Sequence, residues 1–480
     1  MNLLAAKAFA FVIFIASFFP QPTFTEGLIG QPQHINPLKV GTNGVDRDLA
    51  RLIFRGLVSY DERGGIITDL AERYQVSDDQ KEYTLDLRKG VYWHDGVEFT
   101  ADDVLYTVSQ HPQLSTLQVD RLDRYRVRFR LKDPFAPFLD LLTLGIVPAH
   151  LGSSMKDLNP IGTGDYRLVR IKKSDKVNEV VLVRVRPPVP AKGKNFSRLV
   201  FKFYTKTSEL ITAARLGEVD AFFTDEYVPK FSNYNQYRVP LGSRYYTLFI
   251  NLNGNSDLKN KELRQDIASS IPKEKIIDDV YQGFALPAYL PLEYTFATAS
   301  AIKRYNYKDN LPRKYDLSLN LTVPNKDTHL KTGEVIKQSL EKIGIHVTTV
   351  AVDPEKITSD VIGPKNFDLL LLGQEIERDP DVYTLWHSTQ KDLPGLNFVS
   401  FESVLADKAL EEGRKIENVE ERIKHYQNFQ KVFIDEVPAV IIYRPVLTYS
   451  VRSSISGISL KGLFKSEDRF MTIAGWSRKD

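Results

Sequence analysis

Cysteine is absent from the 480-residue chain. Without a thiol the protein forms no disulfide, carries no thiolate nucleophile and offers no acylated cysteine as a lipoprotein anchor. The net charge is also small, because 64 lysines and arginines nearly balance 61 aspartates and glutamates and leave a formal net charge of +3. So small an excess points away from nucleic acid and from anionic membranes as partners.

Motifs for metal, phosphate and nucleophile chemistry are also missing. The eight histidines include no His-Glu-x-x-His sequence and no pair at i, i+4 spacing. Only convergence of His34, His94 and His387 in space would offer a metal site. The stretch "GTGDYR" (162–167) lacks the Lys-Ser/Thr of a phosphate-binding loop, and "HLGSS" (150–154) lacks the nucleophile elbow. We therefore predict no catalytic residue, no metal ligand and no cofactor.

Long hydrophobic runs are scarce, and the one at the N-terminus is short. Lys7 precedes "AFAFVIFIASFF" (8–19), twelve apolar or small residues, and Pro20 follows. A basic residue before such a run is typical of a secretory signal, whereas a spanning helix needs about 20 apolar residues. Residues 1–25 are expected to be an export signal or, since no clear Ala-x-Ala site follows, an N-terminal anchor. The rest of the chain is expected outside the cytoplasmic membrane.

The chain is too long for one hydrophobic core, so two or three lobes are expected. Between 315 and 372 the pattern is informative. "YDLSLNL" alternates as a strand, Glu334–Ile343 carries an apolar helical face ended by Gly344, and "IHVTTV" and "FDLLLLG" follow as strands. Strand–helix–strand order with an uninterrupted apolar run predicts an α/β fold whose parallel sheet is covered on both faces.

The stretch "LRKGVYWHDGVEFTADDV" (87–104) gathers a Trp, a His, three Asp and a Glu. General base catalysis at His94 would need an orienting partner and a nucleophile, and neither lies nearby in the sequence. Asp95-Gly96 suits a turn, and Thr100 with Asp103 forms a capping-box pattern that opens a helix. The stretch is interpreted as scaffold.

"RYRVRFRLK" (124–132) looks like a basic patch. Its arginines alternate with apolar residues at period two, so they fall on one strand face with no aromatic residue among them. A half-buried strand with a solvated arginine face is predicted, and nucleic-acid binding is not.

Polar and aromatic side chains follow the apolar run "FDLLLLG". Ligands in open α/β sheets bind beyond the carboxyl ends of strands, and a polar pocket needs such a mixture of groups. An exposed loop of solvated charges is the alternative. The candidates in this segment are Gly373, Gln374, Glu375, Glu377, Arg378, Trp386, His387 and Gln390.

Seven stretches, in order, carry a family resemblance over nearly the whole chain after the leader. They are "EGLIGQPQHINPL", "DRDLARLIFRGLVSYD", "LAERYQVSDDQKEYTLDLRKGVYWHDGVEFTADDV", "IGTGDYRL", "LGEVDAFF", "FINLNGNSDLKNKELRQDIASSIPKEKIIDDVYQGFALPA" and "VPAVIIYRP". The sequence resembles the family 5, peptide/nickel-type, extracytoplasmic solute-binding proteins of ABC transporters.

The resemblance implies an α/β fold like that of periplasmic binding proteins. Two ligand-gripping lobes are joined by a hinge, and an additional lobe completes the protein. Lobe I would comprise 26–57, 160–245 and 445–480, lobe II 58–159, and lobe III 246–444. The hinge is expected near 244–247 and 440–444.

By position, the family's ligand-lining segments correspond to Thr42–Val45, with Thr42, Asn43 and Gly44 as candidates, and to Leu372–Arg378. Peptide-binding relatives usually grip the ligand's ammonium with an Asp in a Trp-x-x-Asp arrangement. Here Gly373 stands where the Trp would be and Ile376 where the Asp would be, so Glu375 or Glu377 could substitute.

The resemblance implies a monomeric, non-enzymatic binding protein that captures oligopeptides and delivers them to an ABC permease in the membrane. A non-peptide solute (nickel complex, haem, opine or oligosaccharide) is the alternative, because a fold does not fix its ligand. A sensor or chaperone on the same scaffold, and an extracytoplasmic hydrolase, also stay open.

Overall fold

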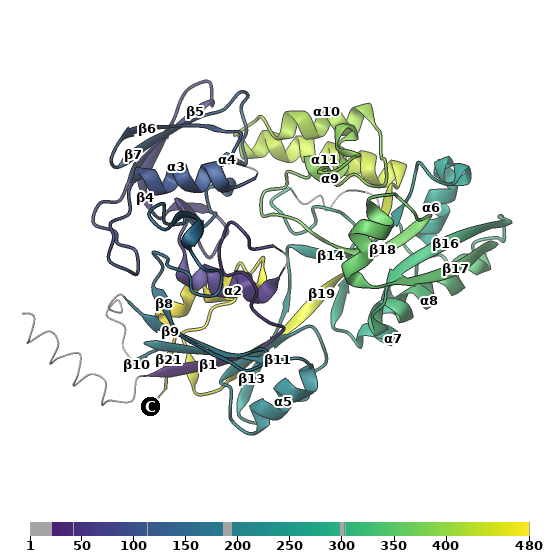
Figure 1. The fold of residues 1–480 in the computed structure, drawn as a ribbon. Coiled ribbons are helices and arrows are strands. Elements are labelled where there is room, and N and C mark those ends of the chain that lie inside the picture. The colour runs from purple at the N-terminus through teal and green to yellow at the C-terminus, as the bar shows by residue number, and fades with distance from the viewer. Residues whose placement is uncertain are drawn as a thin grey trace, which may run out of the picture.

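The computed structural model describes residues 22–41, 43–112, 114–185, 194–297, 302 and 304–479 (Figure 1). Most of the predicted export signal, and Thr42, lie outside the described residues. The predicted boundary at residue 25 falls inside strand β1, which begins at Thr23. The residues from Thr23 to Thr25 pair with a neighbouring parallel strand, so they are part of the fold. Among the described helices, none has the length and apolar character needed to cross a membrane.

One sheet of twelve strands dominates the described chain. Its order is β17-β16-β18-β14-β19-β12-β1-β11-β9-β8, and β13 and β15 also pair with β19. The strands are β1 (Thr23–Ile29), β8 (Tyr166–Lys173), β9 (Val177–Arg184), β11 (Arg198–Tyr204), β12 (Ala221–Thr224), β13 (Tyr234–Pro240), β14 (Arg244–Ile250), β15 (Ala285–Pro287), β16 (Leu317–Pro324), β17 (Ile345–Val352), β18 (Leu369–Glu375) and β19 (Ala439–Arg452).

Strand β19 joins two halves of this sheet. Its first residues pair with β14 and β15, and its later residues pair with β12 and β13. It is buried along almost its whole length. We call β12, β1, β11, β9 and β8 the first half-sheet, and β14, β18, β16 and β17 the second half-sheet. Figure 1 shows β19 passing from one to the other.

The second half-sheet has the predicted parallel arrangement, because β16 runs parallel to both β17 and β18. Helix α8 (Asp327–Lys342) connects β16 to β17 and begins before the predicted Glu334. Its first two turns are largely polar, so the apolar period does not reveal them. Gly344 ends the helix at a φ of +92°, where a Cβ would lie 1.9 Å from the carbonyl oxygen of Tyr315.

Helices cover both faces of the second half-sheet, as the uninterrupted apolar run predicts. One hydrophobic cluster joins Leu370 to Phe429 of α11, and another joins Leu369 and Leu371 to Ile336 of α8. Besides α8, the helices that pack on the two half-sheets are α2 (Gly44–Ile53) and α5 (Thr207–Arg215) on the first, and α6 (Lys261–Ser270), α7 (Lys273–Tyr281), α9 (Tyr383–Trp386), α10 (Val404–Gly413) and α11 (Val419–Glu436) on the second.

A separate four-stranded sheet of β4 (Ala71–Val76), β5 (Glu82–Leu87), β7 (Arg126–Arg130) and β6 (Gln118–Asp123) has its own core. Helix α3 (Ala101–Gln110) lies against it and begins with the predicted capping box of Thr100 and Asp103. His94 Nε2 lies 3.0 Å from the carbonyl oxygen of Gly164, and its Nδ1 accepts from the Gly162 amide at 3.3 Å. Both ring nitrogens thus bind backbone, which supports the interpretation of this stretch as scaffold.

The arginine face of β7 also matches its prediction. Val127 and Phe129 are fully buried, while Arg126 pairs with Asp86 and Arg130 with Glu82 of the neighbouring strand. The apparent basic patch is therefore a ladder of cross-strand ion pairs.

The remaining elements are short connections. They are β2 (Val58–Tyr60), β3 (Ile66–Thr68), β10 (Lys194–Asn195), β20 (Ile455–Ser456), β21 (Ser477–Arg478), α4 (Phe138–Leu141), the single turns η1 (Gly152–Ser154), η2 (Ser256–Lys259), η3 (Pro354–Lys356), η4 (Ile357–Ile362) and η5 (Ser388–Gln390), and the longer 3₁₀ segment η6 (Ser466–Gly475).

Candidate functional site

Strand ends from both half-sheets meet at the junction along β19. Strand β12 ends at Thr224, opposite Thr448 of β19, and β18 ends at Glu375, opposite Arg244 at the start of β14. Ligands of open α/β sheets bind beyond the carboxyl ends of the strands. The junction is therefore the place to look for a site.

Helix α2 brings the first half of the chain to this junction. Asn43 is its N-cap: the side-chain oxygen accepts from the Val45 amide at 3.0 Å, and the side-chain amide donates to the Gln31 carbonyl at 3.0 Å. Gly44 is the first helical residue. These two predicted residues thus fix where α2 starts.

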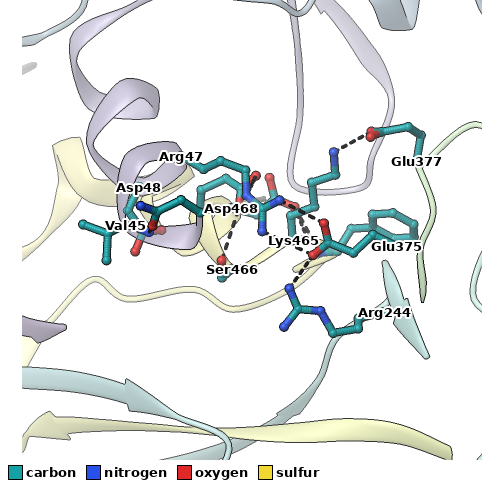
Figure 2. Close-up of polar contacts among 12 residues, drawn as sticks. Val45, Arg47, Asp48, Arg244, Glu375, Glu377, Lys465, Ser466 and Asp468 are labelled. Atoms are coloured by element: carbon teal, nitrogen blue, oxygen red, sulfur yellow. Dashed lines mark hydrogen bonds and ion pairs between the residues drawn. The ribbon is translucent and has the colours of Figure 1, made fainter. Parts of the chain in front are cut away.

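Arg47 and Glu375 bridge the two halves (Figure 2). Arg47 of α2 donates to both carboxylate oxygens of Glu375 of β18, at 2.9 and 3.2 Å. Arg244 adds a third bond to the same carboxylate at 2.6 Å. A bidentate guanidinium–carboxylate pair fixes orientation as well as distance. Glu375, a predicted site residue, is therefore at the junction but already paired.

A second row of ion pairs lies beside this bridge (Figure 2). Lys465 Nζ bonds Glu377 at 2.5 Å. Arg378 bonds Asp468 and the Gly462 carbonyl, and its guanidinium lies over the ring of Tyr60 at 4.9 Å. The predicted residues Glu377 and Arg378 thus fasten the segment after β18 to the C-terminal part of the chain.

The charges of the bridge stabilise one another. Burial works against the charged form of Glu375, but Arg47 and Arg244 together lower the pKa of its carboxyl below the ordinary value. Burial likewise opposes the charge on Arg47, while Glu467 and Glu375 raise the pKa of its guanidinium. Glu375 is therefore ionised at neutral pH.

A buried triad lies against the first half-sheet and joins its first strand to the C-terminal part of the chain. Arg469, fully buried, donates to both oxygens of Asp48 on α2, at 2.7 and 2.6 Å, and to Glu26 of β1 at 2.9 Å. One cation thus serves two carboxylates. Burial, more than the repulsion from Asp48, raises the pKa of Glu26 to about 7, while Arg469 opposes the shift.

Gly373 and Gln374 lie on β18 itself. Gly373 is exposed, and a Cβ there would lie 3.0 Å from the ring of Tyr246. Gln374 is buried opposite Tyr245. The pairing of β18 with β16 stops at Leu370, and within the described residues no strand pairs with that edge of β18 beyond it.

Three predicted residues lie away from the junction. Trp386 is 1% exposed and packs against Phe249 and Phe433 in the hydrophobic cluster under α11. His387 is 3% exposed and lies 3.2 Å from Glu411 of α10. Gln390 is in the turn η5 and bonds its neighbour Thr389. The chain after β18 turns into the helical layer, so this aromatic segment contributes to packing in the described conformation.

Sequence reasoning missed three cations of the site: Arg47, Arg244 and Lys465. Arg47 follows Asp46, the acid in the first turn of α2, so the helix dipole gives no local signal of a distant partner. Its partner is 328 residues away in the sequence, so no local pattern could name it.

Within the described residues, no three histidine, aspartate or glutamate side chains are grouped so as to hold a metal ion.

Known proteins similar to this chain include two curated relatives. The oligopeptide-binding protein AppA of Bacillus subtilis strain 168 is 23% identical over 470 residues, which cover 87% of this chain and 85% of that protein. The probable D,D-dipeptide-binding periplasmic protein DdpA of Escherichia coli K12 is 24% identical over 484 residues, 91% of each chain.

Solved structures share the fold. NikZ from Campylobacter jejuni in complex with Ni(L-His) superposes with a TM-score of 0.77 at 24% identity, over 96% of this chain and 100% of that one. AppA from Bacillus subtilis in complex with a nonapeptide gives the same TM-score and coverage at 22% identity.

The family itself is recognised from the sequence. Residues 65–393, well over half of the chain, match the middle region of the bacterial extracellular solute-binding proteins, family 5. The chain therefore belongs to the family 5 extracellular solute-binding proteins, the non-catalytic binding components of ABC transporters.

Proposed function

We propose that this protein captures short peptides outside the cytoplasmic membrane, closes two lobes around them and delivers them to an ABC permease as a monomer. The similarity over most of the chain to AppA, an oligopeptide-binding protein, and to DdpA, a probable D,D-dipeptide-binding protein, supports the ligand class. NikZ carries a nickel–histidine complex on the same fold, so a nickel complex, haem, opine or oligosaccharide is the alternative ligand. A sensor or chaperone role on this scaffold is a further alternative.

The open edge of β18 is the observation that carries the peptide proposal. Strand β18 is paired along its whole length with β14 on one side, but with β16 only at Leu369 and Leu370 on the other. Alternate backbone groups from Leu371 to Glu375 therefore point to an edge without a partner strand among the described residues. An extended peptide adds to such an edge by main-chain hydrogen bonds, which tolerate many side chains.

We propose the expected division into three lobes, with lobe I extended to include residues Thr23 to Thr25, which belong to β1. Lobe II (58–159) has a hydrophobic cluster of its own, and lobe III (246–444) has two, one on each face of its sheet. Cores that are separate from one another are what independent lobes require.

Closure is proposed about the strands that cross between the lobes. The pairing of β14 with β19 shifts register between Tyr246 and Thr247, inside the expected hinge at 244–247. A bulge bends a strand locally and gives a place for rotation. In the closed form the bidentate pair of Arg47 and Glu375 latches lobe I to lobe III.

The proposed ligand site keeps the residues at the junction. Those that the structure describes are Asn43, Gly44, Gly373, Gln374, Glu375, Glu377 and Arg378; Thr42, outside the described residues, is kept from the sequence. Trp386, His387 and Gln390 are assigned to packing of lobe III.

Mass spectrometry of the co-purifying ligand tests this function. We would purify the protein without denaturant, extract it under denaturing conditions and analyse the extract. A series of short peptides is the expected result. A single non-peptide compound or a metal complex would contradict the peptide class. A protein that arrives empty and also fails to bind a pool of short synthetic peptides would contradict it as well.

A further inference from the structure

One more carboxylate, Asp225, lies at the junction, on the loop that follows β12. Asp225 comes directly after Thr224, the last residue of the strand, which pairs with Thr448 of β19. Asp225 thus occupies the carboxyl end of a first-half strand, as Glu375 occupies the carboxyl end of β18. It is exposed.

The loop that carries Asp225 reaches the second half of the chain. The ring of Tyr227, two residues on, makes an edge contact with Phe284 at 5.8 Å. The carbonyl of Phe284 accepts from the Val446 amide at 3.0 Å, only two residues along β19 from the partner of Thr224. Asp225 therefore lies where the two halves meet.

Aromatic side chains of the second half-sheet and its helices form a cluster near the start of β14. Tyr246 stacks on Tyr443 at 4.7 Å, and Tyr281 of α7 contacts Tyr443 at 4.4 Å. His329 of α8 packs on Tyr246 at 5.1 Å; it is 9% exposed, and its Nδ1 has no hydrogen-bond partner among the described residues. The ring of Tyr246 also lies under Gly373, so this cluster continues to the open edge of β18.

The charge of Asp225 contributes to the pKa of two members of the cluster, Tyr246 and His329. Burial raises the pKa of Tyr246 to about 12; Arg244 opposes the shift, and Asp225 and Glu375 add to it. Burial, helped by Lys326, lowers the pKa of His329 to about 4 although Asp225 works in the other direction. The imidazole is therefore neutral at pH 7 and does not compensate the carboxylate.

Asp225 differs in its partners from Glu375 and Glu377, the two acids after the apolar run of β18 that the sequence singles out. Glu375 bonds Arg47 and Arg244, and Glu377 bonds Lys465, so a ligand ammonium would have to displace a guanidinium or a lysine there. Among the described residues, Asp225 has neither an ion pair nor a side-chain hydrogen bond. Of these three acids, Asp225 is the one for which the described residues supply no cation.

We propose that Asp225, on the loop that places Tyr227 against Phe284 at the junction, binds the ammonium group of the ligand. For a peptide this is the free amino terminus. The inference rests on the proposed function and deepens it by making the ligand cationic at one end. A carboxylate beside electron-rich ring faces attracts an ammonium by charge and by cation–π contact.

The test pairs two variants with two peptide pools. Asp225→Asn removes the charge and keeps the shape, and Glu226→Gln, one residue on and also exposed, removes the same charge outside the site. The probes are a pool of short synthetic peptides with free amino termini and the same pool acetylated at the amino terminus. Binding is measured by native mass spectrometry and by calorimetry.

For the free-amine pool, we expect Asp225→Asn to lose about tenfold or more in affinity and Glu226→Gln less than about twofold. We expect the acetylated pool to bind the wild type weakly and to be insensitive to Asp225→Asn. Equal binding of both pools, or unchanged affinity in Asp225→Asn, would overturn the role of Asp225 and leave the peptide function standing. Failure of the wild type to bind either pool would overturn both.

Discussion

Glu375 and Asp225 hold equivalent positions in the two half-sheets and differ in their surroundings. Each is at the carboxyl end of a strand that lies one or two places from β19. Glu375 receives three hydrogen bonds from Arg47 and Arg244, whereas Asp225 is exposed and has no ion pair among the described residues. The fold thus places two carboxylates alike. They differ in that the chain supplies cations to Glu375, whereas none of the described residues supplies one to Asp225.

A third carboxylate shows another way to neutralise charge. Glu26 shares Arg469 with Asp48, so one cation faces two acids in a fully buried site. There a proton supplies the compensation, as the raised pKa of Glu26 indicates. Glu375 is compensated by the chain's own cations, Glu26 by a proton and Asp225, in our proposal, by the ligand.

The largest effect is expected at Glu26. Its folded pKa of about 7 lies above the ordinary 4.5, so the folded protein keeps a proton that the unfolded chain releases. This contribution to stability is fully present below pH 4.5 and is lost as the pH rises to about 7, at a cost of about 3 kcal/mol.

Urea denaturation of wild type and Glu26→Gln across that range measures it. The amide does not titrate, so the variant should lack this pH dependence. Parallel stability profiles for the two proteins would contradict the proton assignment.

Removal of the bridging guanidinium should have the next largest effect. Arg47→Met leaves Glu375 with one cation and removes the guanidinium 3.7 Å from Glu467, and we expect it to destabilise the protein by about 2 kcal/mol. Arg51→Met, one turn further along α2, removes a guanidinium that bonds only the neutral Ser59 among the described residues. A cost of about 0.5–1 kcal/mol is expected for this control. Equal costs in urea denaturation would show that the bridge adds nothing.

The acid limb of the stability curve tests Glu375 itself. Its pKa is lowered from 4.5, so the contribution of its ion pairs is present above pH 4.5 and is lost as the pH falls through the folded value. Glu375→Gln should remove that loss, changing the acid-side stability difference by about 1 kcal/mol because the carboxylate is partly exposed. An acid limb identical to that of the wild type would argue against an ionised Glu375 in the bridge.

The smallest effect on stability should be at Asp225. Asp225→Asn is expected to change the free energy of unfolding by less than about 0.5 kcal/mol, since the side chain is exposed and holds no partner among the described residues. Thermal denaturation in the absence of ligand measures this. A large loss would give Asp225 a structural role like that of Glu375 and erase the contrast between them.

The sequence anticipated the framework better than the site. Strand–helix–strand spacing predicted the parallel pairing of β16, β17 and β18, and Thr100 with Asp103 predicted the start of α3, because these signals are local. The bridge from Arg47 to Glu375 depends on tertiary folding that joins residues 328 positions apart.

Two placements depend on tertiary packing as well. Trp386 follows the predicted strand in the sequence, but burial of so large an apolar ring in the hydrophobic cluster under α11 outweighs its exposure at the junction. No local signal marks where β1 begins, at Thr23 within the expected leader. Only the parallel pairing with Arg198 reveals it.

The most direct test of closure measures the distance between the lobes. Because the chain has no cysteine, Ser208→Cys on α5 and Glu341→Cys on α8, both exposed, introduce two unique sites for spin labels. We predict that a pool of short peptides shortens the inter-label distance measured by electron paramagnetic resonance, and that Arg47→Met lengthens it. A distance distribution that stays unchanged while peptides bind would contradict capture by closure.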